Sequence, residues 1–213
     1  MTLNYDLGTL KLSEVDMELS GLHILLTYQC IYQCEHCFVW GGPSQKGVLA
    51  INQVEQILQQ AREAGVTSIY FEGGEPFLFR GRAAVVLAPL TPLAMRHPWD
   101  EFTECPHEDL REPGRIHVDP LGNLHICQGV IIGNLFEKPL KEICECYDPD
   151  AHPICGLLLE GGPAALVSEY NLPHETSYAD ACHLCYQARL ALRGRFPQYL
   201  APDQMYGAFD ARK

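Results

Sequence analysis

The chain has 213 residues, of which 15 are Lys or Arg and 27 are Asp or Glu, so its net charge is −12. This acidic balance argues against nucleic acid and anionic membrane surfaces as partners, because both bind clustered Lys and Arg side chains. Hydrophobic residues make up 47% and charged residues 20% of the chain, a composition typical of a folded globular protein. The most apolar stretch, Ala83–Leu90, is far shorter than a membrane-spanning helix requires.

The N-terminal sequence indicates the compartment of the protein and therefore the role of its cysteines. Residues 1–16 contain neither a basic segment nor an apolar one, so we expect no secretory signal. We therefore expect a cytoplasmic protein, in which the ten cysteines serve as metal ligands or redox groups rather than as a disulfide framework.

The first clear structural unit is a strand, a helix and a second strand. Leu22–Tyr28 is nearly all apolar, which is typical of a strand buried on both faces of a parallel sheet. An amphipathic helix follows, for which Asn52 is the expected cap and Gly65 the expected end. Val66–Phe71 is rich in β-branched and aromatic residues and predicts the second strand. The two strands should be parallel, with a right-handed crossover.

The second half of the chain does not continue the alternation of strand and helix. Only 29 residues separate Glu75 from Cys105, which leaves no room for several further β-α units. Residues 148–179 are rich in Pro, Gly and His and predict an irregular loop. The regular elements expected here are a hairpin of Arg115–Val118 and Leu124–Cys127 around a turn at Pro120–Asn123, a helix over Lys138–Tyr147 and a helix over Asp180–Arg193.

A compact group of cysteines directly follows the first predicted strand. Cys30, Cys34 and Cys37 have the spacing C-x3-C-x2-C, so their thiolates can converge on one soft metal centre. Zinc normally takes four protein ligands, whereas three cysteines suit an iron–sulfur cluster with one open iron. A zinc site that includes His36, or plain buried thiols, is the alternative.

With these residues the chain resembles the radical S-adenosylmethionine (SAM) superfamily. In that family three such cysteines bind a 4Fe–4S cluster, whose open iron chelates SAM, and the residue at the position of His36 lies beside the adenine. Gly73, Gly74, Glu75 and Pro76 match the family's GGEP segment, which contacts the methionine amino group of SAM. The resemblance covers roughly residues 20–78 and implies a 4Fe–4S cluster and SAM as cofactors.

A second group of cysteines lies in the C-terminal half. Cys105, Cys127, Cys182 and Cys185 can supply four thiolates from a hairpin and a helix start. The arrangement looks like the SPASM/twitch extension of radical SAM enzymes, which implies an auxiliary 4Fe–4S cluster, although the spacing after Cys105 is longer than in that pattern. A structural zinc ion is the alternative. Cys155 is a candidate substitute ligand, whereas Cys144 and Cys146 are expected to be bystanders on a helix.

The remaining histidines carry less information than the cysteines. We expect surface or capping roles, rather than metal ligation, for His107, His117, His125, His152, His174 and His183.

These observations predict an α/β fold, namely a truncated partial (β/α) barrel of radical SAM type with a small α+β cysteine-rich C-terminal domain. The expected boundaries are 1–100 for the shortened core and 101–213 for the SPASM/twitch-like domain. About four β-α units of a complete barrel are missing, so the outer edge of the second strand should be exposed and could support homo-oligomers.

The resemblance implies an enzyme that cleaves SAM reductively to a 5′-deoxyadenosyl radical and modifies a peptide or small molecule. An electron donor such as flavodoxin or ferredoxin is the expected partner. Because much of the barrel is missing, we expect this chain to cleave SAM poorly or not at all. The alternatives are a non-catalytic iron–sulfur remnant and a zinc-stabilised interaction module.

Overall fold

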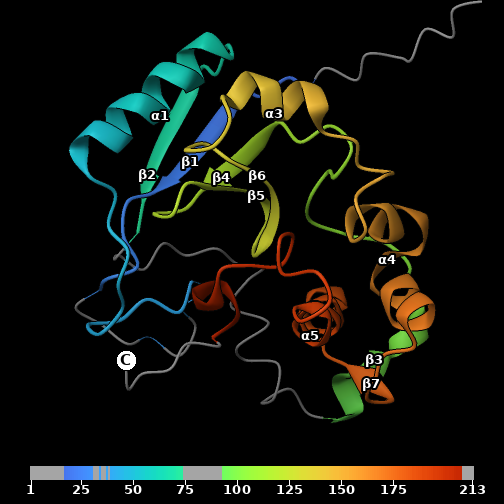
Figure 1. Cartoon of the computed structure of the whole chain (residues 1–213). Coiled ribbons are helices and arrows are strands. Elements are labelled where there is room, and N and C mark those ends of the chain that lie inside the picture. The colour runs from blue at the N-terminus through green and yellow to red at the C-terminus, as the bar shows by residue number, and fades with distance from the viewer. Residues whose placement is uncertain (1–16, 31–33, 35–36, 38, 74–92, 208–213) are drawn as a thin grey trace, which may run out of the picture.

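The computed structural model describes residues 17–30, 34, 37, 39–73 and 93–207. Its main feature is a five-stranded mixed sheet with the order β2-β1-β4-β5-β6, and β3 and β7 form a separate two-stranded pair (Figure 1). The strands are β1 (Gly21–Leu25), β2 (Ser68–Glu72), β3 (His97–Pro98), β4 (Arg115–Val118), β5 (Asn123–Cys127), β6 (Val130–Asn134) and β7 (Ser177–Tyr178). The α-helices are α1 (Ile51–Glu63), α3 (Leu140–Cys146), α4 (Cys155–Tyr170) and α5 (Ala181–Leu192), and short 3-10 helices cover Leu93–Met95, Trp99–Glu101 and Asp203–Tyr206.

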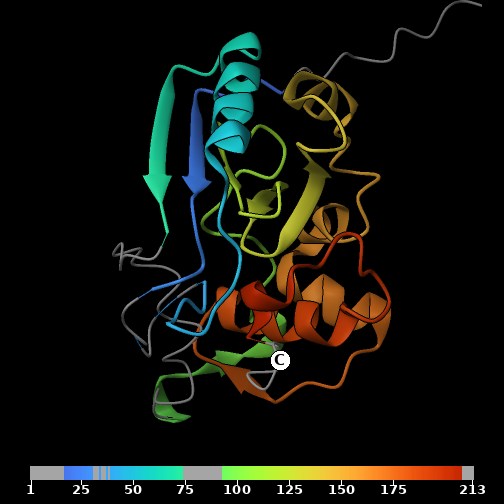
Figure 2. The same cartoon turned by 60° about the vertical axis from the view of Figure 1, so that its left-hand side comes forward.

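The predicted strand–helix–strand unit is confirmed. Strands β1 and β2 are parallel, with Gly21 opposite Ser68 and Leu25 opposite Glu72, and α1 connects them. Figure 2 shows both arrowheads pointing the same way. Every residue of β1 is buried, as its apolar sequence predicted, because β1 has a neighbouring strand on each side.

The start of α1 differs from the prediction. The cap is Ala50 rather than Asn52, and the side chain of Gln53 accepts a hydrogen bond from the Ala50 N–H at 2.8 Å. The expected end is correct: Gly65 has a φ of 80° and its N–H donates to the Arg62 carbonyl at 3.2 Å. An alanine can occupy the cap because a side chain from within the helix binds the exposed backbone N–H.

The sheet continues from β1 into the second half of the chain. Strand β4 lies parallel to β1, with Gly21 opposite Arg115, and the predicted hairpin of β4 and β5 is antiparallel as expected. Strand β6, which the sequence analysis did not predict, extends the sheet beyond β5. The structure is therefore mixed α/β with a mixed sheet. A radical SAM barrel and a domain boundary near residue 100 stay predictions, and one sheet takes strands from both sides of that boundary.

Helices α1 and α3 lie together on one side of the sheet, and α5 lies away from them (Figures 1 and 2). The side chain of Gln60 on α1 donates to the Leu135 carbonyl at 3.2 Å and accepts the Leu140 N–H at 2.8 Å. One amide thus joins the first helix to the start of α3. Within the described ranges, no helix has both the length and the apolar character needed to cross a lipid bilayer.

The expected loop over residues 148–179 is wrong, because helix α4 occupies much of it. Gly161 and Gly162 have non-helical backbone angles, so α4 consists of two helical pieces with Pro163 starting the second. The Pro and Gly residues correctly indicated an interruption of regular structure at the kink. They also led to the wrong prediction of a loop where two helical pieces lie on either side of it. Leu158 and Leu166, one from each piece, are buried in the core.

The kink in α4 makes room for the segment that leads to Cys105. Gly162 has a φ of 62°, and a Cβ atom placed there would lie 2.3 Å from the backbone nitrogen of Glu104. The Ala164 N–H also donates to the Phe102 carbonyl at 3.1 Å. A side chain at this position would displace the backbone immediately before Cys105, so glycine is required.

A buried carboxylate joins β1 to the β4–β5 hairpin. One oxygen of Asp119 accepts the N–H groups of Leu121 and Asn123 at 2.8 and 2.9 Å. The other accepts from the Asn123 amide at 2.9 Å, His125 Nε2 at 3.1 Å and the Tyr28 hydroxyl at 3.2 Å. Burial favours the neutral acid, but the hydrogen bonds and charge of His125, together with Asn123, lower the pKa of Asp119 below its usual value.

We predict that Asp119→Ala lowers the free energy of unfolding by about 3 kcal/mol, because it leaves several buried donors without an acceptor. The matched control is Asp109→Ala. Asp109 is exposed and accepts only the N–H groups of Arg111 and Glu112, so its loss should cost about 1 kcal/mol or less. Urea unfolding of both variants measures the difference, and equal losses would contradict the assigned role.

We also predict an acid-dependent contribution from Asp119. Its pKa is lowered in the folded state, so its stabilising effect is complete above the unfolded pKa of about 4 and is lost as the pH falls through the folded pKa. The difference in unfolding free energy between the wild type and Asp119→Asn should therefore be constant near neutral pH and shrink below about pH 4. A difference that does not change with pH would contradict this prediction.

Candidate functional site

The N-terminal cysteines lie on a loop that returns to the end of β1. The Cys30 N–H donates to the Gly42 carbonyl at 3.1 Å, and the Gly42 N–H donates to the Tyr28 carbonyl at 3.3 Å. Backbone hydrogen bonds therefore close the loop at its base. Since β1 and β2 are parallel, this base lies at the carboxyl end of the sheet, where α/β proteins bind ligands.

The structure places Cys30 and Cys37 beside one glycine and joins Cys34 to Cys37 through the backbone. A Cβ atom placed on Gly41 would lie 3.5 Å from Cys37 Sγ and 3.6 Å from Cys30 Cβ, so both cysteines flank the same glycine. Cys34 is joined to them through its carbonyl, which accepts the Cys37 N–H at 3.1 Å. All three side chains are partly exposed, which leaves the loop accessible to a metal centre.

One contact in this loop is suited to a thiolate. The Gly41 N–H donates to Cys37 Sγ at 3.1 Å. Hydrogen bonds from backbone N–H groups to cysteine sulfur stabilise negative charge on the sulfur and tune iron–sulfur centres. The donor set and its N–H contact thus fit a three-cysteine cluster. Binding of a metal by Cys30, Cys34 and Cys37 stays a prediction.

Gly73 meets the backbone just before the cysteine loop. It has a φ of 105°, and a Cβ atom placed there would lie 2.6 Å from the carbonyl oxygen and 2.9 Å from the nitrogen of Thr27. Only glycine permits this approach, which places the start of the GGEP segment beside the chain that leads into Cys30. Gly74, Glu75, Pro76 and His36 lie outside the described residues, so their cofactor contacts stay predictions.

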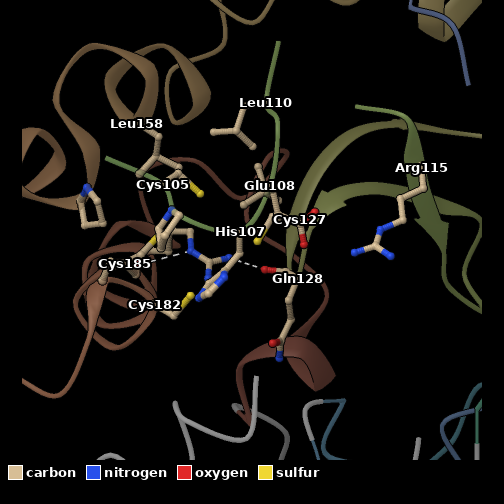
Figure 3. Close-up of a pocket in the computed structure, with 15 residues that line it drawn as sticks. Cys105, His107, Glu108, Leu110, Arg115, Cys127, Gln128, Leu158, Cys182 and Cys185 are labelled. Carbon is tan, nitrogen blue, oxygen red and sulfur yellow. Dashed lines mark hydrogen bonds between the residues drawn. The ribbon is translucent and has the colours of Figure 1, made fainter. Parts of the chain in front are cut away.

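The four C-terminal cysteines gather around one cavity. Cys105, Cys127, Cys182 and Cys185 all line a pocket of about 170 Å³, which is shown in Figure 3. Cys127 is the last residue of β5, and Cys182 and Cys185 lie in the first turn of α5. That helix begins as predicted at Asp180, whose side chain accepts the His183 N–H at 2.7 Å. Metal binding here stays a prediction, with iron–sulfur and zinc both open.

A buried arginine accompanies these cysteines, and the sequence analysis missed it. Arg189 lies one helical turn after Cys185 on α5, is 4% exposed and donates to the carbonyls of Cys185 and Gln128. Burial opposes its charge, but the negative potential of Cys185, Tyr206 and Cys127 raises its pKa well above the usual value. Arg189 can thus balance part of the charge that several thiolates would bring to one cavity.

Two thiols of this group, those of Cys182 and Cys185, favour the neutral form when no metal holds them. Burial, together with the nearby Cys127, raises the pKa of Cys185 to about 11, although Arg189 acts in the opposite direction. Burial and the charges of Cys127 and Cys185 raise the pKa of Cys182 as well. A nucleophilic cysteine needs the opposite environment, so this arrangement suits metal ligation better than thiol catalysis.

The three cysteines outside the two groups, Cys144, Cys146 and Cys155, differ in burial and position. Cys155 is fully buried at the start of α4, and burial raises its pKa to about 12, with Cys127 and Cys185 close enough to contribute. It does not line the cavity, so its role as a substitute ligand stays a prediction. Cys144 and Cys146 lie on α3 as expected, the first buried and the second exposed.

The expectation of surface or capping histidines is only partly correct. His107 and His174 are exposed. His152 is buried, and its Nδ1 accepts the N–H groups of Ile154 and Cys155 at the start of α4, which is a capping role. The expectation is wrong for three of the six histidines, because long-range packing rather than local sequence buries them: His117, His125 and His183 are each less than 10% exposed.

Two curated proteins are similar to part of the chain. A probable GTP 3′,8-cyclase from Sulfolobus acidocaldarius is 30% identical over 69 residues, which cover 32% of this chain and 22% of the relative. An S-adenosylmethionine-dependent nucleotide dehydratase from Oncorhynchus mykiss is 36% identical over 67 residues, which cover 32% of this chain and 19% of the relative. No family model and no solved structure matches the chain.

Both similarities agree with the resemblance to radical SAM enzymes noted for the N-terminal part of the chain, and one of the two relatives is named for its dependence on SAM. The chain spans only about a fifth of the length of the curated relatives it matches. The similarity therefore supports the general class and leaves the reaction and the substrate open.

We predict that the double variant Cys105→Ala/Cys127→Ala, reconstituted anaerobically with iron and sulfide, contains less iron than the wild type by one cluster. Two of the four thiolates around the cavity are then missing. Cys146→Ala is the matched control, because Cys146 is exposed on α3 and lines no part of this cavity. Iron and sulfide analysis measures the change. An iron content equal to that of the parent protein would show that this cavity holds no cluster.

Proposed function

We propose that the chain is an iron–sulfur protein of radical SAM type, in which Cys30, Cys34 and Cys37 hold a 4Fe–4S cluster that binds SAM. The observation that carries this proposal is the contact of Gly73 with Thr27, because it joins the GGEP segment to the cysteine loop. The two partial similarities add support, one of them to a protein whose name states its dependence on SAM.

When bound, such a cluster supplies one electron to SAM, which breaks a carbon–sulfur bond and yields methionine and a 5′-deoxyadenosyl radical. The described residues contribute the site. Gly41 stabilises the sulfur of Cys37 through its N–H, and Gly73 brings the two binding segments together. Radical formation of this kind would serve the modification of a peptide or small molecule.

The second cysteine group fits an auxiliary centre in this proposal. Its four thiols line a cavity beside the buried Arg189, whose positive charge would offset part of the negative charge of the ligands. An auxiliary 4Fe–4S cluster would carry electrons or hold substrate. A structural zinc ion would only stabilise the packing of α5 against β5.

Two partner proposals accompany this function. Reductive cleavage requires an electron donor, and a flavodoxin or ferredoxin provides electrons of suitable potential. Strand β2 lies at the edge of the described sheet, where Tyr70 and Phe71 are 52% and 50% exposed. An exposed apolar edge is prone to pair with a second chain, so self-association along β2 is the expected mode.

We predict that adding SAM changes the electron paramagnetic resonance spectrum of the reduced, reconstituted wild type. Cys34→Ala should lose this response, because two thiolates cannot hold the SAM-binding cluster, whereas Cys146→Ala should keep it. A cluster signal that SAM leaves unchanged would favour the non-catalytic iron–sulfur protein. A colourless protein with stoichiometric zinc would favour the interaction module.

We further predict that an isolated monomer forms 5′-deoxyadenosine slowly, with few turnovers or none. The exposed edge at β2 leaves the described sheet open on one side, and radical chemistry requires a closed site that excludes water. Chromatography of reactions with dithionite and SAM measures the product, and light scattering establishes the oligomeric state. Multiple turnovers by a demonstrated monomer would contradict the prediction.

A further inference from the structure

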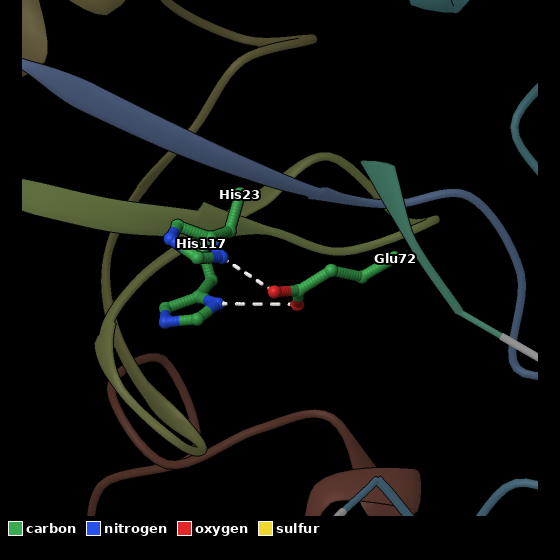
Figure 4. A group of neighbouring side chains, drawn as sticks. All are labelled: His23, Glu72 and His117. Atoms are coloured by element: carbon green, nitrogen blue, oxygen red, sulfur yellow. Dashed lines mark hydrogen bonds and ion pairs between the residues drawn. The ribbon is translucent and has the colours of Figure 1, made fainter. Parts of the chain in front are cut away.

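Three ligand-type side chains, none of them a cysteine, converge on one face of the sheet. His23 lies on β1, Glu72 on β2 and His117 on β4, as Figure 4 shows. The strand register explains the convergence. His23 is directly opposite His117 on one side and Tyr70 on the other, and Glu72 follows Tyr70 by two residues on the same face of β2.

The ligand atoms of the three side chains are close together. His23 Nδ1 is hydrogen-bonded to Glu72 Oε1, and His117 Nδ1 lies 3.7 Å from Glu72 Oε2. One ligand atom from each residue lies within 4.8 Å of the other two. Bonds of about 2.0–2.2 Å to a common zinc ion would place such atoms about 3 to 4 Å apart, so modest side-chain shifts suffice.

Burial makes this arrangement unusual. The three side chains are 8 to 10% exposed, and Glu72 Oε2 has no hydrogen-bond partner among the described residues. A buried carboxylate oxygen that has an ion-pair neighbour at 3.7 Å but no hydrogen bond is costly, and a bound cation would reduce that cost. Burial raises the pKa of Glu72, but the favourable interactions with the nearby His117 and His23 outweigh it and bring the value to about 2, so the carboxylate is ionised.

We propose that His23, Glu72 and His117 form a binding site for a divalent transition-metal ion of the zinc type. Two imidazoles and one carboxylate are a common ligand set for zinc, and calcium and magnesium prefer sites made of oxygen atoms alone. The ligands come from three adjacent strands, which hold them more firmly than loops would. The site shares no ligand with either cysteine group, although Glu72 directly precedes Gly73 of the GGEP segment.

The surroundings limit what else such an ion can bind. Glu72 and His117 line a cavity of only about 10 Å³, close to the space that one water molecule needs. On the other side, the ring of Tyr70 stacks on His23 with centroids 4.6 Å apart. The ion would therefore have three protein ligands and room for one water, which favours a stabilising ion that joins the three strands over a substrate-binding one.

The test compares zinc content between the wild type and Glu72→Gln after reconstitution of the clusters, incubation with zinc chloride and desalting. Glutamine keeps the shape of the side chain and removes its charge. We expect the wild type to retain one more zinc ion per chain than the variant, whichever metal the cysteines hold, since both proteins have the same cysteines. We also expect zinc to raise the melting temperature of the wild type by more than that of the variant.

Two further variants complete the experiment. His117→Gln should lose the same zinc ion, which guards against a folding defect peculiar to one substitution. His97→Gln is the matched control, because His97 and Glu101 form an exposed pair at 3.5 Å for which the described residues offer no third ligand, and it should retain the ion. Equal zinc content in the wild type, Glu72→Gln and His117→Gln would overturn the proposal and leave a hydrogen-bonded network without a metal.

Discussion

The buried carboxylate of Asp119 is the contact on which the arrangement of both cysteine groups depends. It holds the hydroxyl of Tyr28, two residues before Cys30, and it also holds the turn of the hairpin that ends in Cys127. The hydroxyl of Tyr28 stays a donor, because burial and the charge of Asp119 raise its pKa well above the usual value. One anion thus fixes the position of the first cysteine loop relative to the strand that leads to the second group.

The hydrogen bonds of Asp119 matter because one continuous sheet carries residues of both cysteine groups. Strand β1 carries the N-terminal cysteine loop at its end, β4 pairs directly with β1, and β5 carries Cys127. Because adjacent strands share backbone hydrogen bonds, the two cysteine groups belong to one framework rather than to two loosely joined parts. The same adjacency brings His23, Glu72 and His117 to one face, since each comes from a different strand.

Sequence reasoning succeeded where the signal was local. The β1–α1–β2 unit, the β4–β5 hairpin and the start of α5 at Asp180 all follow from short patterns and caps. It failed at α4, where Gly161 and Gly162 mark a kink between two helical pieces. It also missed the roles of Asp119, Arg189 and His117, because these depend on strand pairing between distant segments. The sequence pattern of β1 or of β4 does not reveal that the two strands pair in parallel.

For the two metal sites proposed above, the pairing of β1 with β4 would also set the order in which the cysteine groups bind their metals. The side chain of Ser20 bonds to the Gly114 carbonyl across a separation of 94 residues, and contacts between such distant segments form late because the chain must first close a long loop. The thiols of the first group all lie within eight residues of one another in the sequence. They can therefore bind a metal before the rest of the chain has folded. The second group takes its thiols from β5, α5 and the segment before β4, and it exists only once the sheet has formed. Biogenesis of this protein would therefore load the two groups in sequence, with folding as the step between them.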